Sequence, residues 1–283
     1  MPDYRVIGVM SGSSLDGLDI IYVTFHVTAD AWKYKIGHAV CKPYAEYWAN
    51  KLQYAVSMNA LEYQLFHTEY GRYLGDCVNL FIRDNQLEGK VDLVACHGHT
   101  VFHLPGQMTT TQVGDGAAVA AVTGLPTVSD FRSVDVALQE GFAEILGRGL
   151  RPRNPLPTDS GSRSVDTDAM RTFTAHICNQ AVATVQVVKK TVEDRYPGHC
   201  NMLVTGGGAR NTFLVQELTK ALREQDITLT VPEDQLVDFK EALMTAALGV
   251  LRLREEVSFF SKVSGATRNS VGAALWSGAP KQA

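Results

Sequence analysis

Apolar and polar residues alternate with a period of two near the start of the chain, which is typical of β-strands. Tyr4 to Met10 is rich in β-branched residues, and Ile20 to Val27 alternates in the same way. The segment between them, Ser11 to Gly17, is polar and contains two glycines. This pattern predicts an N-terminal hairpin with a glycine-bearing turn.

Helical spacing replaces this alternation between Tyr44 and Leu87. The helical pattern is interrupted near Ser57 to Asn59, so the segment predicts two helices. Strand and helix then alternate, with a buried-strand run at Val91 to Cys96, a short helix at Ala117 to Val122 and another strand at Pro126 to Phe131. This order favours an α/β fold.

Glycine and proline break every period between Glu140 and Asp168, where the stretch GRGLRPRNPLPTDSGSRS is typical of a loop or linker. We therefore predict an N-terminal lobe at 1–147, a linker or truncated region at 148–166 and a C-terminal lobe at 167–283. Helices and strands are expected to alternate again in the C-terminal lobe, at Met170–Val192, Met202–Thr205, Thr212–Arg223, Ile227–Val231 and Leu236–Arg254.

Composition agrees with a folded chain of two units, because 283 residues is about twice the length of an average domain. With 45% hydrophobic and 20% charged residues, the chain is not of the disordered or low-complexity class. The net charge is −4 and no long run of like charge occurs. Binding to nucleic acid or to an anionic membrane is therefore not expected.

The cysteines and the N-terminal residues bear on the compartment. Five cysteines are odd in number, widely spaced and without a CxxC pair, which is typical of a reducing environment. The opening MPDYRVIGVMSG has neither the apolar stretch nor the cleavage site of a signal peptide. No segment reaches the roughly 18 apolar residues of a membrane span. We expect a cytoplasmic protein.

The turn GVMSGSSLDGLD at 8–19 is the first candidate site. Gly12 and Gly17 let backbone amides turn inward, the serines offer further donors, and Asp16 or Asp19 could hold a magnesium ion. A phosphate cradle fits this composition. A plain glycine/serine hairpin is the alternative, since the turn has neither a Walker-type lysine nor GxGxxG.

The segment TGGGARN at 205–211 is the second candidate, placed between a predicted strand and a predicted helix. Three successive glycines permit the close approach of a ligand, and the N-terminal amides of the next helix favour an anion. A tight structural crossover would use the same glycines, so this alternative stays open.

The segment ACHGHTVFH at 95–103, followed by QVGDG at 112–116, is the third candidate. Cys96, His97, His99 and His103 suggest zinc, but structural zinc sites usually contain a second such group elsewhere, which this sequence lacks. We therefore expect no zinc. We favour a polar ligand-binding loop at the C-terminal end of a parallel strand.

The segment SDFRSVD at 129–135 is the fourth candidate. A carboxylate here could act as a general base, while Arg132 could neutralise a phosphate or orient a substrate carboxylate. The alternative is a capped turn with a surface ion pair.

Taken in order, these segments resemble the anhydro-N-acetylmuramic acid kinase family, within the actin/hexokinase-like sugar kinase superfamily. GVMSGSSLDGLD is similar to the family's G-x-M-S-G-T-S-x-D-G-x-D, with Ser13 in place of threonine. CHGHTVFH is similar to C-H-G-Q-T-x-x-H, with His99 in place of glutamine. The remaining matches are QVGD to Q-x-G-D, SDFRSVD to S-D-F-R-x-x-D, GGGARN to G-G-G-A-x-N, KEAL at 240–243 and SGA at 264–266.

The resemblance implies a two-lobed actin/hexokinase-like (ribonuclease H-like) α/β fold, with mixed sheets flanked by helices and ATP in the cleft between the lobes. It implies that the γ-phosphate of ATP is transferred, with Mg²⁺, to a 1,6-anhydro amino sugar recovered from the cell wall, with hydrolytic opening of the anhydro ring. The implied partners are this sugar and ATP, with no nucleic acid or membrane, and a homodimer is left open.

The resemblance also implies roles for individual residues. Asp135 would be the base that activates water, and His97, Arg132 and Glu241 would bind the sugar. The nucleotide would contact two glycine-bearing turns, at Gly12, Ser13, Ser14, Leu15, Asp16, Gly17, Leu18 and Asp19 and at Gly206, Gly207 and Gly208.

The middle of the chain departs from the family pattern. After the aspartate of S-D-F-R-x-x-D the family carries a G-G-Q-G-A-P stretch and later N-L-G-G-I-A-N, which forms a second phosphate-binding hairpin. Here Asp135 is followed by Val-Ala-Leu-Gln-Glu and then by the predicted linker, so both elements are missing. Either this sequence omits a central segment of the protein or the protein is a reduced relative of the family. The rival hypothesis is therefore a catalytically inactive relative that binds nucleotide or sugar without turnover. A metal-dependent hydrolase built on CHGHTVFH is a third.

Overall fold

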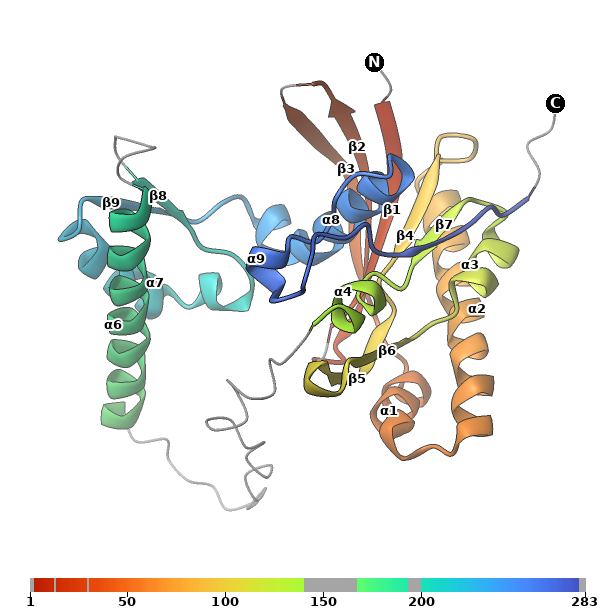
Figure 1. Cartoon of the computed structure of the whole chain (residues 1–283), viewed down its shortest axis with the longest axis horizontal. Helices are drawn as coiled ribbons and strands as arrows, with labels where there is room; N and C mark the ends of the chain where they lie inside the picture. Colours follow the sequence, from red (N-terminus) through yellow and green to blue (C-terminus); the bar gives the residue numbers. More distant parts are fainter. Residues whose placement is uncertain (1–2, 13, 30, 140–166, 193–199, 280–283) are drawn as a thin grey trace. The chain divides into compact units, whose positions relative to one another are not determined.

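The computed structural model describes residues 3–12, 14–29, 31–139, 167–192 and 200–279. The chain divides into two compact units (Figure 1). Met1–Pro152 and Glu241–Ala283 form the first unit, and Arg153–Lys240 form the second. The predicted linker at 148–166 lies outside the described residues.

A six-stranded mixed sheet forms the centre of the first unit as the structure describes it. Strand β1 is antiparallel to β2 and parallel to β4, β2 is antiparallel to β3, and β7 is parallel to β4 and antiparallel to β10. The strand order is β10 (Ala274–Trp276), β7 (Thr127–Ser129), β4 (Leu93–Cys96), β1 (Asp3–Ser11), β2 (Gly17–Val27) and β3 (Trp32–Pro43).

Successive side chains of β1 point to opposite faces of this sheet. Both faces are covered by helices. Ile7 and Val9 are buried in the same core as Phe66 and Tyr70 of helix α2 (Ala60–Asp84). Further helices of the first unit are α1 (Glu46–Tyr54), the 3₁₀ turn η1 (Ala55–Ser57) and α3 (Gly116–Thr123).

The other face of the sheet is covered by the C-terminal part of helix α8 (Asp234–Leu253). A Cβ atom added to Gly8 of β1 would lie 2.2 Å from the carbonyl oxygen of Ala242, and one added to Gly249 would lie 2.7 Å from Cβ of Ala95. Helix and sheet are in contact through small residues, so larger side chains at these positions would push the two layers apart.

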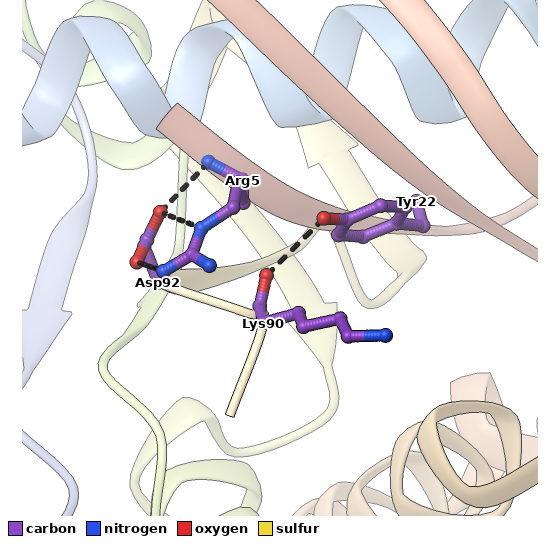
Figure 2. A network of polar contacts seen from close by, with 4 residues as sticks. All are labelled: Arg5, Tyr22, Lys90 and Asp92. Carbon is purple, nitrogen blue, oxygen red and sulfur yellow. Dashed lines mark hydrogen bonds and ion pairs between the residues drawn. The ribbon is translucent and has the colours of Figure 1, made fainter. Parts of the chain in front are cut away.

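A polar contact fixes the N-terminal ends of β1 and β4 to each other (Figure 2). Arg5 donates to the Asp92 carboxylate from its backbone N at 2.9 Å, from Nε at 3.0 Å and from Nη2 at 2.6 Å. The hydroxyl of Tyr22 donates to the carbonyl of Lys90 at 3.2 Å. The segment that leads into β4 is thereby held against β1 and β2 at the end opposite the glycine-bearing turn.

Several small elements of the first unit carry parts of the third and fourth motifs and of the SGA segment. Strands β5 (His99–Leu104) and β6 (Thr109–Val113) form an antiparallel hairpin around the 3₁₀ turn η2 (Pro105–Gln107). Helix α4 (Ser133–Ala137) follows β7, and helix α9 (Ser261–Ser264) belongs to the C-terminal segment.

The second unit contains a two-stranded parallel sheet, β8 (Cys200–Leu203) and β9 (Ile227–Thr230). Helices α6 (Thr167–Val192) and α7 (Thr212–Arg223) and the 3₁₀ turn η3 (Gly207–Arg210) accompany it. Its small core contains Cys178, Leu218, Leu222 and Ile227.

The structure confirms the predicted α/β class with a mixed sheet flanked by helices. It also contains elements that the pattern analysis did not identify, namely β3, the β5–β6 hairpin, α4 and β10. Residues Glu241–Ala283 belong to the first unit, whereas the sequence prediction grouped them with the second. The physical reason is that β10 pairs with β7 and α8 packs on β1. Phe239, beside this division, interrupts α8 with φ −108° and ψ 16°.

No helix in the described ranges is both long enough and apolar enough to cross a membrane.

Candidate active site

The glycine-bearing turn joins β1 to β2 at the C-terminal end of β1. Leu15 adopts φ 57°, its amide donates to the carbonyl of Gly12 at 3.4 Å, and the Ser14 hydroxyl donates to Asp16 at 2.7 Å. Ser13 lies outside the described residues. The turn therefore presents a short run of backbone and hydroxyl groups beyond the end of the sheet.

Residues of this turn differ in what surrounds them. A Cβ on Gly12 would meet only the Ser14 side chain, at 3.3 Å, whereas a Cβ on Gly17 would lie 2.6 Å from Sγ of Cys41 and 2.8 Å from the carbonyl oxygen of Lys42. The Leu18 side chain is fully buried in the core, and Leu15 packs against it. Gly12, Ser14 and Asp16 thus offer surface to a ligand, while Gly17 and Leu18 have clear packing roles.

Asp19 lies within β2, where it pairs with Met10 of β1 and Cys41 of β3. Oxygen ligands such as the carboxylates of Asp16 and Asp19 suit a magnesium ion. These two residues, on either side of Gly17, are the ones in this turn that would hold it.

His97 and Arg132 come together from two different motifs. His97 follows β4, and its amide donates to the carbonyl of Val9 at 3.0 Å. Nε of Arg132, which precedes α4, lies 3.2 Å from Nε2 of His97, and Nδ1 of His97 lies 3.1 Å from the carbonyl oxygen of Gly98. Burial, together with the Arg132 charge, lowers the pKa of His97. A neutral imidazole that accepts from Arg132 and donates to Gly98 satisfies both contacts.

Asp135 lies on α4 one turn after Arg132 and is 6% exposed. Its Oδ1 accepts from the Ser264 hydroxyl at 2.7 Å, and its Oδ2 accepts from Nε2 of Gln139 at 3.2 Å. Each oxygen of an ionised carboxylate can accept more than one hydrogen bond. The two donors therefore orient the carboxylate without exhausting its capacity to accept a proton.

A cavity of about 250 Å³ adjoins His97. Its lining comes from the third and fourth motifs, from α2 and from β10, and includes His67, His97, Gln112, Asp115, Gly116, Ser129, Asp130 and Trp276. Gln112 is 9% exposed, and its Oε1 has no hydrogen-bond partner in the described part of the chain. A buried acceptor without a donor is costly, so a ligand N–H or O–H placed here would be stabilised.

Gly116 is required where α3 begins beside this cavity. A Cβ on Gly116 would lie 2.1 Å from Oγ of Ser129 and 2.7 Å from Nε1 of Trp276, which itself donates to Ser129 at 3.0 Å. Three segments that are distant in the sequence therefore meet at one point.

The zinc hypothesis receives no support from the geometry of the third motif. His97, His99 and His103 bond to Arg132, Ser11 and Thr110 respectively. Burial raises the pKa of the Cys96 thiol to about 12, which disfavours the thiolate that zinc needs. Across the described ranges, no three histidine, cysteine or acidic side chains are grouped to hold a metal.

The triple glycine belongs to the second unit. Gly206 has φ 77°, a conformation that favours glycine, and its amide donates to the carbonyl of Val237 at 3.2 Å. A Cβ on Gly206 or Gly207 would meet nothing within 4 Å, and one on Gly208 would meet only Leu214, at 3.9 Å. A tight structural crossover explains why glycine is needed at position 206, where φ is positive, but not at positions 207 and 208. The open space at Gly207 and Gly208 fits the close approach of a ligand.

Glu241 is exposed on α8 and belongs to the first unit. It directly precedes Ala242, whose carbonyl oxygen faces Gly8 of β1. Its carbonyl accepts from the Thr245 hydroxyl at 2.9 Å, and its carboxylate is thus carried on a regular helical turn beside the sheet.

Several residues of this site are not marked individually by any motif in the sequence. Ser264 was noted only as part of SGA, and Gln112 only as part of QVGD. The hydroxyls of Tyr44 and Tyr70 are hydrogen-bonded at 2.6 Å. In the sequence, nothing distinguishes these two tyrosines from the other aromatic residues nearby. No local signal identifies such partners, because their contacts bridge segments far apart in the chain.

Two features define the class of this protein: a mixed α/β sheet that ends in a hydroxyl-rich glycine turn, and a buried aspartate on a neighbouring motif. Both are typical of the sugar kinases that the sequence resembles. The family model for anhydro-N-acetylmuramic acid kinase matches residues 4–144 and 164–277. The chain therefore belongs to the anhydro-N-acetylmuramic acid kinase family. The match is interrupted at 145–163, on the glycine- and proline-rich stretch.

Proposed function

We propose that this protein is an ATP-dependent kinase that phosphorylates 1,6-anhydro-N-acetylmuramic acid and opens its anhydro ring, in the recycling of cell-wall amino sugars. One observation carries the proposal beyond family membership. The Asp135 carboxylate is buried on α4 and held by two donors, Ser264 and Gln139. A general base needs this kind of fixed orientation.

The reaction requires a base because water is consumed. Water attacks C1 of the sugar while one of its protons passes to the Asp135 carboxylate. The bond between C1 and O6 breaks, and its electron pair remains on O6. O6 then attacks the γ-phosphorus of ATP, the bond to the β–γ bridging oxygen breaks, and ADP leaves. Asp135 finally releases its proton to solvent.

The nucleotide in this proposal contacts two glycine-bearing turns. The open space at Gly207 and Gly208 supports close contact with adenosine, and the Gly12 turn, where a Cβ would meet only the Ser14 side chain, is proposed to receive the phosphates. Magnesium would neutralise charge on the phosphates, and Asp16 and Asp19 are the residues proposed to hold it. The sugar is proposed to contact His97, Arg132 and Glu241. We further propose that the protein acts in the cytoplasm on these small molecules, without nucleic acid or membrane partners.

The decisive experiment incubates the purified chain with Mg·ATP and 1,6-anhydro-N-acetylmuramic acid in water enriched in ¹⁸O. We expect ADP release coupled to formation of the 6-phosphate, with the heavy oxygen at C1 of the product. Binding of ATP or sugar without turnover would instead favour an inactive relative, for which the absent second phosphate hairpin is the first explanation. Failure to bind either molecule would contradict both hypotheses.

A further inference from the structure

A chain of hydrogen bonds runs from the interior of the first unit to the start of the glycine-bearing turn. The hydroxyls of Tyr70 and Tyr44 are 2.6 Å apart, Tyr44 donates to Oγ of Ser11 at 2.7 Å, and Oγ of Ser11 lies 3.0 Å from Nδ1 of His99. Tyr70, Ser11 and His99 are 0%, 3% and 7% exposed. The four groups join α2, the segment before α1, the end of β1 and the start of β5.

The direction of these hydrogen bonds follows from the number of hydrogens. Each hydroxyl carries one hydrogen, and that of Tyr44 is used on Ser11. Tyr44 therefore accepts from Tyr70, and the Ser11 hydrogen is available to Nδ1 of His99. Every hydroxyl in the chain of hydrogen bonds has an acceptor when this hydrogen goes to Nδ1, which requires a neutral His99 with its ring hydrogen on Nε2.

Ser11 is the last residue of β1, and Gly12 follows it directly. Two partners on the Ser11 side chain thus fix the point at which the chain leaves the sheet to form the turn. We propose that His99 is a positioning residue for nucleotide binding: its neutral Nδ1 accepts from Ser11 and thereby holds the Gly12 turn in the geometry that receives the phosphates. The inference rests on the proposed function, because it takes the ligand of this turn to be Mg·ATP.

Protonation of His99 would disturb this arrangement. A hydrogen on Nδ1 would have to donate to the Ser11 oxygen, which already accepts from Tyr44, and the Ser11 hydrogen would lose its acceptor. The titratable groups that interact with His99 and its partners include Tyr44, Tyr70, Tyr73, Cys77, Cys96 and His97. Burial and then His97 lower the pKa of His99, so that the neutral acceptor form predominates at neutral pH.

The test measures the dissociation constant of Mg·ATP by calorimetry between pH 5 and pH 8 in the wild-type chain and in His99→Gln. A glutamine amide oxygen accepts from Ser11 but does not titrate. Because ATP itself titrates in this range, the quantity compared is the ratio of the two dissociation constants. We expect a ratio near one at pH 8 and about tenfold weaker binding by the wild type at the acid end, since a mispaired buried hydroxyl is costly.

His26→Gln is the matched control, because it removes an exposed histidine paired with Asp3 at the other end of β2. Its binding should follow the wild type at every pH. A second measurement, ¹⁵N NMR of the His99 ring, should show Nδ1 without hydrogen at pH 8. If His99→Gln keeps the wild-type pH dependence, or if the ring carries its hydrogen on Nδ1, the positioning role is wrong. Absence of Mg·ATP binding by all variants at every pH would instead overturn the proposed function, and this role with it.

Discussion

Nε of Arg132 lies 3.2 Å from Nε2 of His97, so a neutral histidine holds the guanidinium, and among the described residues no carboxylate forms an ion pair with it. The histidine is itself fixed, because Nδ1 faces the carbonyl oxygen of Gly98 at 3.1 Å. An ion pair with a carboxylate would neutralise the arginine. A neutral partner orients Arg132 and leaves its positive charge available to a phosphate or a substrate carboxylate.

Two roles are open to His97, direct contact with the sugar and orientation of Arg132. Two substitutions of His97 distinguish them. If His97 acts through Arg132, His97→Gln should stay within about threefold of wild type, because its amide oxygen accepts from Nε. His97→Leu should raise KM for the sugar by about tenfold or more, with a smaller change in kcat, because a hydrogen bond to a charged group is lost. Steady-state kinetics of both variants decides the matter. Equal losses in the two would show that the imidazole contacts the sugar.

Asp135→Asn should lower kcat by roughly 10²–10⁴-fold, because an amide cannot accept the proton of the attacking water. The introduced amide would keep the bond from Ser264 but would direct N–H toward the donor Gln139. Asp135→Asn combined with Gln139→Glu restores a donor–acceptor pair there without restoring the base. We expect the double variant to regain stability and to remain inactive, by rate assay and thermal unfolding. Wild-type turnover in Asp135→Asn alone would show that Asp135 is not the base.

Gly12 and Gly17 allow a matched comparison within one turn. Gly12→Val should leave the fold intact, because the space beyond Cα contains only the end of the Ser14 side chain, and should abolish stabilisation by Mg·ATP. Gly17→Ala should lower the free energy of unfolding by about 1–3 kcal/mol, because its Cβ would collide with Cys41 and the backbone of Lys42. Thermal unfolding with and without Mg·ATP measures both effects. An unchanged nucleotide shift in Gly12→Val would exclude this turn as a phosphate site.

The elements with a strong internal period were predictable from the sequence. The N-terminal hairpin, the two helices broken before Ala60 and the buried strand β4 all form as predicted. The break between the two helices has a local cause in the sequence, a capping box at the start of α2. The Asn59 side chain accepts from the amide of Glu62, and the Glu62 carboxylate accepts from the amide of Asn59. Such elements depend on neighbours in sequence.

The elements that were missed depend on tertiary contacts. Strand β3 is mostly exposed and has no burial pattern to detect, and it forms because β2 offers a long antiparallel edge. Strand β10 is three residues long and forms through pairing with β7, about 145 residues earlier in the chain. The candidate site follows the same rule. The glycine turns and Asp135 were marked by motifs, whereas Ser264 and Tyr70 matter only through distant partners.

The triple glycine gives a second comparison. Gly206→Ala should be destabilising by about 1 kcal/mol, because φ 77° is unfavourable for any residue with a Cβ. Gly207→Ala should leave stability unchanged, since its Cβ would meet nothing within 4 Å, yet weaken nucleotide binding if adenosine approaches there. Circular dichroism melting and calorimetric titration with Mg·ATP separate the two effects. Wild-type affinity in Gly207→Ala would show that adenosine does not bind against Gly207.

Stability of the first unit should fall as the solution becomes acidic. Burial is the main cause that lowers the pKa of His67, His97 and His99 below the ordinary value of 6.5. Between the folded and unfolded pKa values the unfolded chain binds more protons, so folding stability is complete above about pH 6.5 and is lost as the pH falls below it. The expected result is a free energy of unfolding that is level from pH 8 to pH 7 and declines below.

The three tryptophans, Trp32, Trp48 and Trp276, all belong to the first unit, so urea unfolding followed by tryptophan fluorescence reports on this unit alone. His67→Gln is the informative variant. Nδ1 of His67 accepts from the amide of Gly114 at 3.2 Å, and a glutamine oxygen can replace it without titrating. The variant should show a shallower decline below pH 6.5, while His26→Gln at the exposed edge serves as control. A decline that is equally steep in His67→Gln would mean that this histidine contributes nothing to the acid sensitivity.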